Sequence, residues 1–275
     1  GMNKDILVLG KGYIGSRIKE EFDCAQSSKM ICSFSDAERE IKKNKPKIII
    51  NCIGHIGRNV DECELDKDKT LAANAFVPII LAEVALRNRI RLVHISSGCI
   101  YNYDYGKDNP IEEDAPPNFF RLFYSRSKIY SERALEPFSK EYPILIARIR
   151  VPLDNRPNPR NILDKLISYK KSIIDIPNSI TYMPDFIKAL KYLIKIKAVG
   201  IYNITNKGAL RYSELLDVYK KYVPSFNYKI IDYKKLNLVR TNIILSVKKL
   251  EGTGFKVRDI HQVLEECVKS YLKYS

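Results

Sequence analysis

The stretch Gly10-Lys11-Gly12-Tyr13-Ile14-Gly15 decides the fold, because it joins an apolar run at residues 5–9 to a helical pattern at residues 14–22. A G-x-G-x-x-G turn in that setting is typical of dinucleotide-binding sheets. Its first glycine permits the tight turn, its second lets backbone approach a pyrophosphate, and its third lets the helix pack closely on the strand. The helix N-terminus then faces the anion. The residues expected to hold the cofactor here are Gly10, Gly12, Tyr13, Ile14 and Gly15.

Short apolar runs and longer helical patterns alternate along the first 150 residues. The predicted strands lie at residues 5–9, 24–26, 47–51, 91–95 and 144–148. The predicted helices lie between them, at residues 14–22, 36–44, 68–87 and 125–139. Continuous apolar runs suit strands that are buried on both faces. The alternation therefore predicts an α/β fold, a Rossmann-like doubly wound parallel sheet with right-handed crossovers.

The alternation of apolar runs and helical patterns ends after Arg150. Three prolines, at positions 152, 157 and 159, predict a loop. Helices are expected beyond it at residues 161–169, 185–195, 212–222 and 260–272, and strands at residues 172–176 and 200–204. We expect an NADP-binding domain at residues 1–151, with a return segment at 181–206 packed on it. Residues 152–275 are expected to form a smaller C-terminal substrate-binding lobe.

Composition narrows the class of protein. The chain has 275 residues, six cysteines with no C-x-x-C pair, and three histidines, so we expect neither a metal site nor a disulfide framework. The net charge of +15 is spread along the chain, which favours attraction of a phosphate-bearing substrate over a nucleic-acid surface. No uninterrupted apolar run reaches membrane-span length, and residues 1–4 are not those of a signal peptide. A cytoplasmic location without a membrane partner is expected.

The end of the second predicted strand bears on the choice of cofactor. NAD enzymes usually place a carboxylate there to hold the ribose 2′-hydroxyl. This chain instead has Ser27, Ser28 and Lys29. Hydroxyls and an amine suit a 2′-phosphate, so we expect NADPH, with Lys29 among the residues that bind it.

Three residues predict the chemistry of carbonyl reduction. Tyr124 and Lys128 form Tyr-x-x-x-Lys, which places both side chains on one face of a helix. A neighbouring ammonium favours the phenolate, so the tyrosine can exchange protons near neutral pH. Ser97 follows a predicted strand, where ligands of open α/β sheets bind, and can donate to a substrate carbonyl.

With this order of motifs, the chain resembles the extended short-chain dehydrogenases/reductases. Ser96-Ser97-Gly98-Cys99-Ile100-Tyr101 is similar to the sugar-nucleotide branch and to dTDP-4-dehydrorhamnose reductase. Further segments resemble the 3,5-epimerase/4-reductase that forms the second half of plant rhamnose synthases. They are Gly57-Arg58-Asn59-Val60-Asp61, Phe123-Tyr124-Ser125, Arg148-Ile149-Arg150-Val151-Pro152, Asn158-Pro159-Arg160-Asn161 and Ile176-Pro177-Asn178-Ser179. The glycine loop is one residue shorter than is typical of that family.

The resemblance implies roles for further residues. Cys99 and Lys165 would serve as acid and base on opposite faces of the sugar, Asn74 would order the catalytic lysine through water, and Val151 would flank the nicotinamide. Cys52, Ile53 and Gly54 would line the adenosine side with backbone. Candidates for substrate contacts are Arg58, Cys99, Arg160 and Asn161.

The implied activity is an NADPH-dependent 3,5-epimerase/4-reductase that converts a nucleotide-4-keto-6-deoxyhexose, linked to UDP or dTDP, to a nucleotide-L-rhamnose-type sugar. Three alternatives stay open: reduction alone, the same chemistry on an N-acetylated sugar, and a cofactor-binding regulatory subunit. The superfamily often pairs through helices such as 68–87 and 125–139, so a homodimer is also an open alternative.

Overall fold

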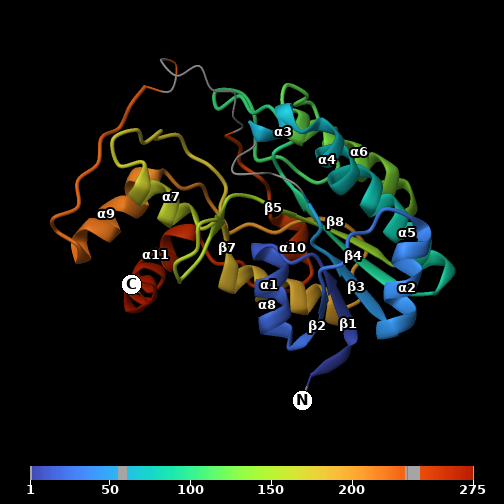
Figure 1. Ribbon diagram of the computed structural model, residues 1–275. Helices are drawn as coiled ribbons and strands as arrows, with labels where there is room; N and C mark the ends of the chain where they lie inside the picture. The colour runs from blue at the N-terminus through green and yellow to red at the C-terminus, as the bar shows by residue number, and fades with distance from the viewer. Residues whose placement is uncertain (1, 55–60, 233, 235–241, 275) are drawn as a thin grey trace. The chain divides into compact units, whose positions relative to one another are not determined.

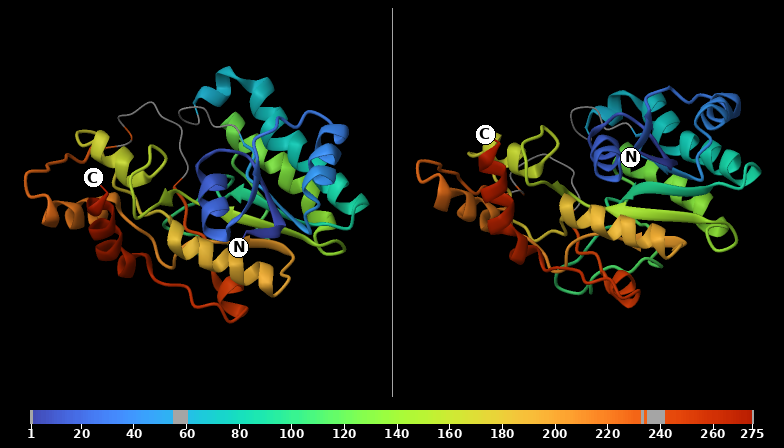
Figure 2. Two further views of the ribbon diagram at one scale, coloured as in Figure 1. Left: turned by 60° about the horizontal axis from the view of Figure 1, so that its bottom comes forward. Right: turned by 90° about the horizontal axis from the view of Figure 1, so that it is seen from below.

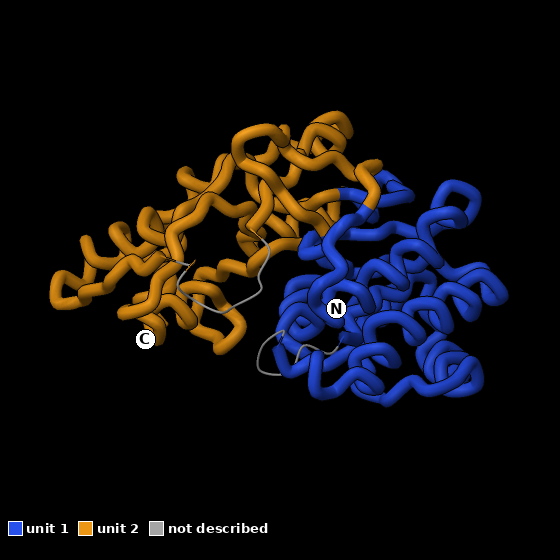
Figure 3. The backbone as a smooth tube through the Cα atoms, turned by 90° about the horizontal axis from the view of Figure 1, so that it is seen from above, with its two compact units in different colours: residues 1–100, 117–148, 193–202 blue, residues 101–116, 149–192, 203–275 orange. Residues whose placement is uncertain are grey.

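The computed structural model describes residues 2–54, 61–232, 234 and 242–274. The chain divides into two compact units (Figure 3). Unit 1 comprises Gly1–Ile100, Pro117–Arg148 and Leu193–Tyr202, and unit 2 comprises Tyr101–Pro116, Ile149–Tyr192 and Asn203–Ser275. The predicted division at residue 151 falls near the passage from Arg148 to Ile149. Of the predicted return segment 181–206, only residues 193–202 belong to unit 1, and residues 101–116 belong to unit 2.

Unit 1 is built on a six-stranded sheet in the order β2-β1-β3-β4-β5-β8 (Figure 1). The strands are β1 (Asn3–Leu9), β2 (Cys24–Ser27), β3 (Ile48–Asn51), β4 (Arg91–Ser97), β5 (Ile144–Ile149) and β8 (Gly200–Asn203). Strand β1 pairs in parallel with both β2 and β3, and β3 pairs in parallel with β4. The predicted Rossmann-like α/β fold is confirmed.

The helices of unit 1 are α1 (Tyr13–Phe22), α2 (Phe34–Asn44), α3 (Glu62–Leu65), α4 (Lys67–Leu71), α5 (Val77–Arg87) and α6 (Phe123–Leu135). Helices α2, α5 and α6 share one apolar core with the sheet, built from residues such as Ile41, Leu81 and Leu135. Helix α1 packs on β1 and β2. Strands β1 and β3 are neighbours, but the chain continues from β1 to β2 toward one edge of the sheet and from β3 to β4 toward the other edge. Such a pair of strands marks a topological switch point, where dinucleotides bind.

The helix predicted at residues 68–87 is not regular. Between α4 and α5 the chain forms a π-helical turn, Ala72–Phe76, and Asn74 lies buried in its middle. Turns of this kind occur often at functional sites. Periodicity alone could not predict the turn, because the apolar pattern continues on both sides of it.

The stretch Lys67–Arg87 is also, among the described residues, the one helical stretch long and apolar enough to cross a membrane. Asn74 and Glu83 interrupt its apolar residues, so no single apolar run marks it in the sequence. Half of its apolar window is buried inside the protein, and α5 packs against α2 and α6. Such packing is typical of a core helix.

Unit 2 contains a two-stranded parallel sheet and five helices among its described residues. The strands are β6 (Pro152–Leu153) and β7 (Thr181–Tyr182). The helices are α7 (Ile162–Ser168), α8 (Met183–Lys195), which runs on into unit 1, α9 (Tyr212–Tyr222), α10 (Lys248–Gly252) and α11 (Ile260–Lys273). Helices α9 and α11 lie side by side (Figure 2) and bury one apolar core with α7.

The prediction of a strand at residues 172–176 is wrong. Only Ile173 pairs, through a single bridge to Ile230. The next residues are used differently, because Asp175 accepts hydrogen bonds from the Ser213 amide and the Arg211 side chain at the start of α9. These polar contacts end the pairing after one residue.

Candidate active site

The glycine turn after β1 has the shape that a dinucleotide requires. Gly10 has φ +107°, and a Cβ atom there would meet the Cys52 carbonyl carbon at 2.8 Å. A Cβ on Gly15 would meet the Gly10 oxygen at 2.6 Å, so α1 approaches the turn closely. A Cβ on Gly12 would meet no protein atom within 4 Å. Gly12 therefore faces open space at the start of α1, which is where a pyrophosphate would lie.

The end of β2 contains two contacts that spacing along the chain did not predict. Gln26 donates from Nε2 to the Gly10 oxygen at 2.8 Å and so braces the glycine turn. The Ser27 hydroxyl donates to Glu40 Oε2 at 2.8 Å, so a carboxylate does reach this strand end, from α2. Lys29 is exposed just beyond. Because the Glu40 carboxylate already accepts a hydrogen bond from Ser27, the exposed charge next to the strand end is that of Lys29.

The segment after β3 lies next to helix α6. The Cys52 amide donates to the Leu9 oxygen, which continues the β1–β3 pairing past the strand. A Cβ on Gly54 would lie 3.2 Å from Asn74 Oδ1 and 3.5 Å from Lys128 Nζ. Gly54, Asn74 and Lys128 therefore converge, as expected for residues that share one site. Arg58 lies outside the described residues.

The predicted pair Tyr124 and Lys128 lies on α6, one helical turn apart. The Lys128 ammonium lies 5.7 Å from the centre of the Tyr124 ring. Lys128 is 7% exposed, and burial lowers the pKa of its ammonium, while the nearby Cys99 and Glu132 raise it. Asn74 donates from Nδ2 to the Ser127 hydroxyl at 3.1 Å, and so ties the π-helical turn to the same helix.

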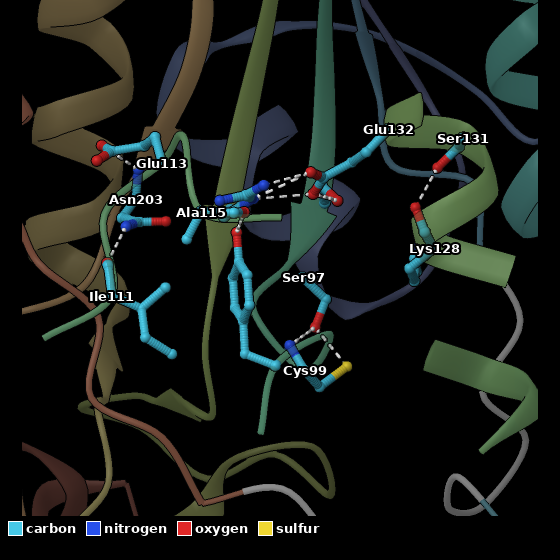
Figure 4. Close-up of polar contacts among 12 residues, drawn as sticks. Ser97, Cys99, Ile111, Glu113, Ala115, Lys128, Ser131, Glu132 and Asn203 are labelled. Carbon is cyan, nitrogen blue, oxygen red and sulfur yellow. Dashed lines mark hydrogen bonds and ion pairs between the residues drawn. The ribbon is translucent and has the colours of Figure 1, made fainter. Parts of the chain in front are cut away.

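The end of β4 places a serine and a cysteine in direct contact (Figure 4). Ser97 Oγ lies 2.8 Å from Cys99 Sγ, and the Cys99 amide donates to Ser97 Oγ at 3.2 Å. Cys99 also lies close enough to the Lys128 ammonium to raise its pKa. The thiol thus lies within the same group of side chains as the predicted proton donors.

Four predicted residues belong to unit 2. Val151 has φ +37°, a left-handed conformation that is strained for a β-branched residue and typical of functional sites. Lys165 is half-buried on α7. Asn161 caps α7 instead of pointing to a ligand, because Oδ1 accepts from Leu163 and Asp154 and Nδ2 donates to Asp154 and Arg156. These four bonds favour a structural role over the predicted substrate contact. The Arg160 amide donates to Asn158 Oδ1 in the same loop.

A buried ion pair beneath the site was not predicted. Glu132 on α6 and Arg148 on β5 are joined at 2.6 Å, with side chains 3% and 1% exposed. Glu132 also accepts from the Ser96 hydroxyl. The sequence does contain one indication of this role for Glu132, since it lies one helical turn after Lys128 on the same face of the predicted helix.

The Rossmann unit has a glycine turn suited to a dinucleotide. Beside it, Lys128 lies near Tyr124 and near Cys99, which contacts Ser97. Together these features define an NADPH-dependent oxidoreductase of the short-chain dehydrogenase/reductase type. Residues 4–176 match the RmlD substrate binding domain, and the chain belongs to that family. The predicted resemblance is confirmed.

Similar proteins come from a plant, a virus and bacteria. A trifunctional UDP-glucose 4,6-dehydratase/UDP-4-keto-6-deoxy-D-glucose 3,5-epimerase/UDP-4-keto-L-rhamnose-reductase of Arabidopsis thaliana is 34% identical over 86% of this chain, which spans 35% of that protein. A bifunctional dTDP-4-dehydrorhamnose 3,5-epimerase/dTDP-4-dehydrorhamnose reductase of the same plant is 34% identical over 69% of this chain and 64% of its own length. The crystal structure of the L780 UDP-rhamnose synthase from Acanthamoeba polyphaga mimivirus superposes with a TM-score of 0.89 at 26% identity, over 96% of this chain and 99% of that one. A dTDP-4-dehydrorhamnose reductase from Bacillus anthracis in complex with NADP shares the fold, with a TM-score of 0.80 at 21% identity, over 94% and 96% of the two chains.

Proposed function

We propose that the chain is an NADPH-dependent 3,5-epimerase/4-reductase of a nucleotide-4-keto-6-deoxyhexose, with a nucleotide-L-rhamnose-type sugar as its product. The contact between Ser97 Oγ and Cys99 Sγ carries the proposal. It places a thiol, which can exchange protons with carbon, beside the hydroxyl suited to hold the ketone oxygen. Reduction of the ketone does not itself require such a thiol, whereas epimerisation requires a group that exchanges protons with carbon.

The residues that would hold NADPH are those of the glycine turn, Lys29, the backbone of residues 52–54, and Val151. NADPH supplies a hydride for the C4 carbon when it is bound. Tyr124 gives its phenolic proton to the C4 oxygen, and the Lys128 ammonium stabilises the phenolate that remains. Ser97 donates to the same oxygen and fixes its position.

The epimerase step uses the same oxygen-binding groups. The C4 ketone acidifies the hydrogens on C3 and C5, and removing one as a proton leaves an enolate whose charge lies on the C4 oxygen. Cys99 as thiolate takes this proton from one face, and Lys165 as ammonium returns a proton to the opposite face, so the carbon inverts. Ser97 can donate to the thiolate sulfur before the substrate arrives, which helps to form the reactive state.

The proposal is tested with UDP-4-keto-6-deoxyglucose and NADPH in heavy water, followed by NMR of the sugar. We expect an L-rhamnose product with deuterium at C3 and C5. Cys99→Ala should lose the deuterium exchange and keep NADPH-dependent reduction of an already epimerised ketone. The control is Cys32→Ala, which removes an exposed thiol and should exchange like the parent.

Two other results would redirect the proposal. NADPH oxidation without deuterium incorporation by the parent would mean a 4-reductase only. Turnover of the acetamido analogue but not of the hydroxyl sugar would move the substrate to an N-acetylated 4-keto-6-deoxyhexosamine. Both arms use the same NMR readout.

A further inference from the structure

One buried carboxylate joins three elements of unit 1. Glu132 on α6 accepts hydrogen bonds from Arg148 at Oε1 (2.6 Å from Nη2) and from Ser96 at Oε2 (2.7 Å from Oγ). Arg148 Nε lies 3.1 and 3.0 Å from the two oxygens. The bonds of Glu132 are drawn in Figure 4. Helix α6 is thus fixed to strands β4 and β5 through a single side chain.

The two ends of this connection adjoin the proposed catalytic residues. Glu132 lies one helical turn beyond Lys128, which in turn lies one turn beyond Tyr124. Ser96 is the neighbour of Ser97 on β4. The carboxylate therefore links the helix that carries the proton donor to the strand that carries the carbonyl-binding hydroxyl. Any slide or rotation of α6 along β4 would have to break this link.

Stability alone is a poor reason for such a pair. Arg148 is 1% exposed and Glu132 is 2% exposed, so both charges are removed from water. Replacement of a buried ion pair by apolar residues of similar size is often neutral or stabilising, because the desolvation cost disappears. What an apolar pair cannot supply is a directional bond from helix to strand, since apolar contacts do not fix one rotation.

We propose that Glu132 is a positioning residue, which sets the place of Tyr124 and Lys128 relative to Ser97 through its bonds to Ser96 and Arg148. The inference rests on the reductase chemistry proposed above. Glu132 has a second effect through its charge, because it is an anionic neighbour of the Lys128 ammonium. Position and charge can be separated by choosing which partners are removed.

Three variants make this separation. Ser96→Ala removes only the link to β4 and leaves the ion pair in place. Glu132→Gln removes the negative charge and leaves the shape. The double variant Glu132→Leu/Arg148→Met removes both charges, keeps the net charge of the site and is expected to fold even where Glu132→Gln does not. Ser139→Ala is the matched control, because Ser139 is similarly buried and its hydroxyl, among the described residues, bonds to the nearby Glu136 oxygen.

The measurements are kcat, KM and their pH profiles for 4-keto sugar reduction, thermal unfolding, and hydrogen–deuterium exchange of peptides from α6. We expect Ser96→Ala and the double variant to lose roughly tenfold or more in kcat with sugar KM within about twofold, since misplaced groups chiefly weaken the transition state. In Glu132→Gln the alkaline limb of the kcat profile should also shift to lower pH, because loss of an anion lowers the pKa of a nearby acid. In the double variant the loss of the Arg148 cation should offset part of this shift.

Exchange in α6 should quicken in Ser96→Ala, and its melting temperature should fall by a few degrees, because a buried bond to a charged group is lost. Both quantities should stay near the parent values in the Ser139→Ala control. Full kcat in Ser96→Ala and in the folded double variant would overturn the proposal and leave the pair a merely structural one. If the parent itself reduces no 4-keto sugar, the proposed function fails, and unchanged α6 exchange in Ser96→Ala would then overturn the positioning role separately.

Discussion

Asn51 Nδ2 and His94 Nδ1 lie 3.2 Å apart across the paired strands β3 and β4, and both side chains are buried. The amide nitrogen can only donate, so His94 Nδ1 accepts and its proton lies on Nε2. Nε2 is buried and has no hydrogen-bond partner among the described residues. Burial, with a smaller effect of the Lys128 charge, lowers the pKa of His94 to about 3. The pair therefore holds a neutral imidazole beneath the site.

This neutral histidine predicts a loss of stability in acid. In the unfolded chain His94 binds a proton below its usual pKa of 6.5, while the folded chain does not until about pH 3. The free energy of unfolding should therefore fall as pH drops, by about 2–3 kcal/mol between pH 6.5 and 4.5 from this group. Urea unfolding at several pH values would measure the slope. His94→Gln should flatten it, and an unchanged slope in that variant would contradict the assignment.

The glycine turn predicts two different outcomes from the same substitution. Gly15→Ala forces a Cβ to 2.6 Å from the Gly10 oxygen and should lower the free energy of unfolding by about 1–3 kcal/mol. Gly12→Ala meets no protein atom, so the fold should keep its stability while the Kd for NADPH rises about tenfold or more. Thermal melts and fluorescence titration with NADPH would separate the two. Gly252→Ala, which also meets nothing, serves as the control.

Lys29 should matter only for a cofactor that carries a 2′-phosphate. Lys29→Ala removes one exposed positive charge at the end of β2, and we expect the Kd for NADPH to rise about tenfold while that for NADH stays nearly constant. Lys43→Ala removes a charge that is also exposed, on α2, and should change neither constant. Equal weakening of NADPH and NADH binding by Lys29→Ala would place the 2′-phosphate elsewhere.

Tyr124→Phe should remove the proton donor and little else. Loss of a general acid typically costs about 10²–10⁴ in kcat, and the change keeps the ring that lies 5.7 Å from the Lys128 ammonium. Pre-steady-state kinetics in ordinary and heavy water would measure the loss. NADPH binding should stay within about threefold, because the hydroxyl is all that is removed. A variant with near-parent kcat would exclude Tyr124 as the acid.

Much of unit 1 could be predicted from sequence because its signals are local. Strands β1, β3 and β5 each contain a continuous apolar run, and the Gly10–Gly15 turn and the Tyr124–Lys128 spacing each lie within a few residues. The helices predicted at residues 212–222 and 260–272 match α9 and α11 to within one residue. The site residues found in this way are those whose neighbours in space are also neighbours in sequence.

What escaped prediction depends on contacts between distant residues. The Ser96–Glu132 bond spans 36 positions and the Glu40 contact with Ser27 spans 13, and no period of helix or strand encodes either. The prediction of a strand near Ile173 failed for the same reason, since Asp175 is held by hydrogen bonds from the start of α9, which is far away in the sequence. Asn161 was predicted as a substrate contact, whereas the cap it forms depends on the path of the loop from Asp154.

The π-helical turn Ala72–Phe76 has a consequence for protein design. A π turn holds one residue more than an α-turn, so the helix on one side is rotated by about 100° relative to the other side. Asn74 can therefore point its amide at Ser127 while α5 keeps its apolar stripe on the sheet. An asparagine grafted into an uninterrupted helix of another scaffold would face the wrong way. What must be copied is the extra residue, and deleting one residue from this turn should disconnect the amide without changing any side chain of the site.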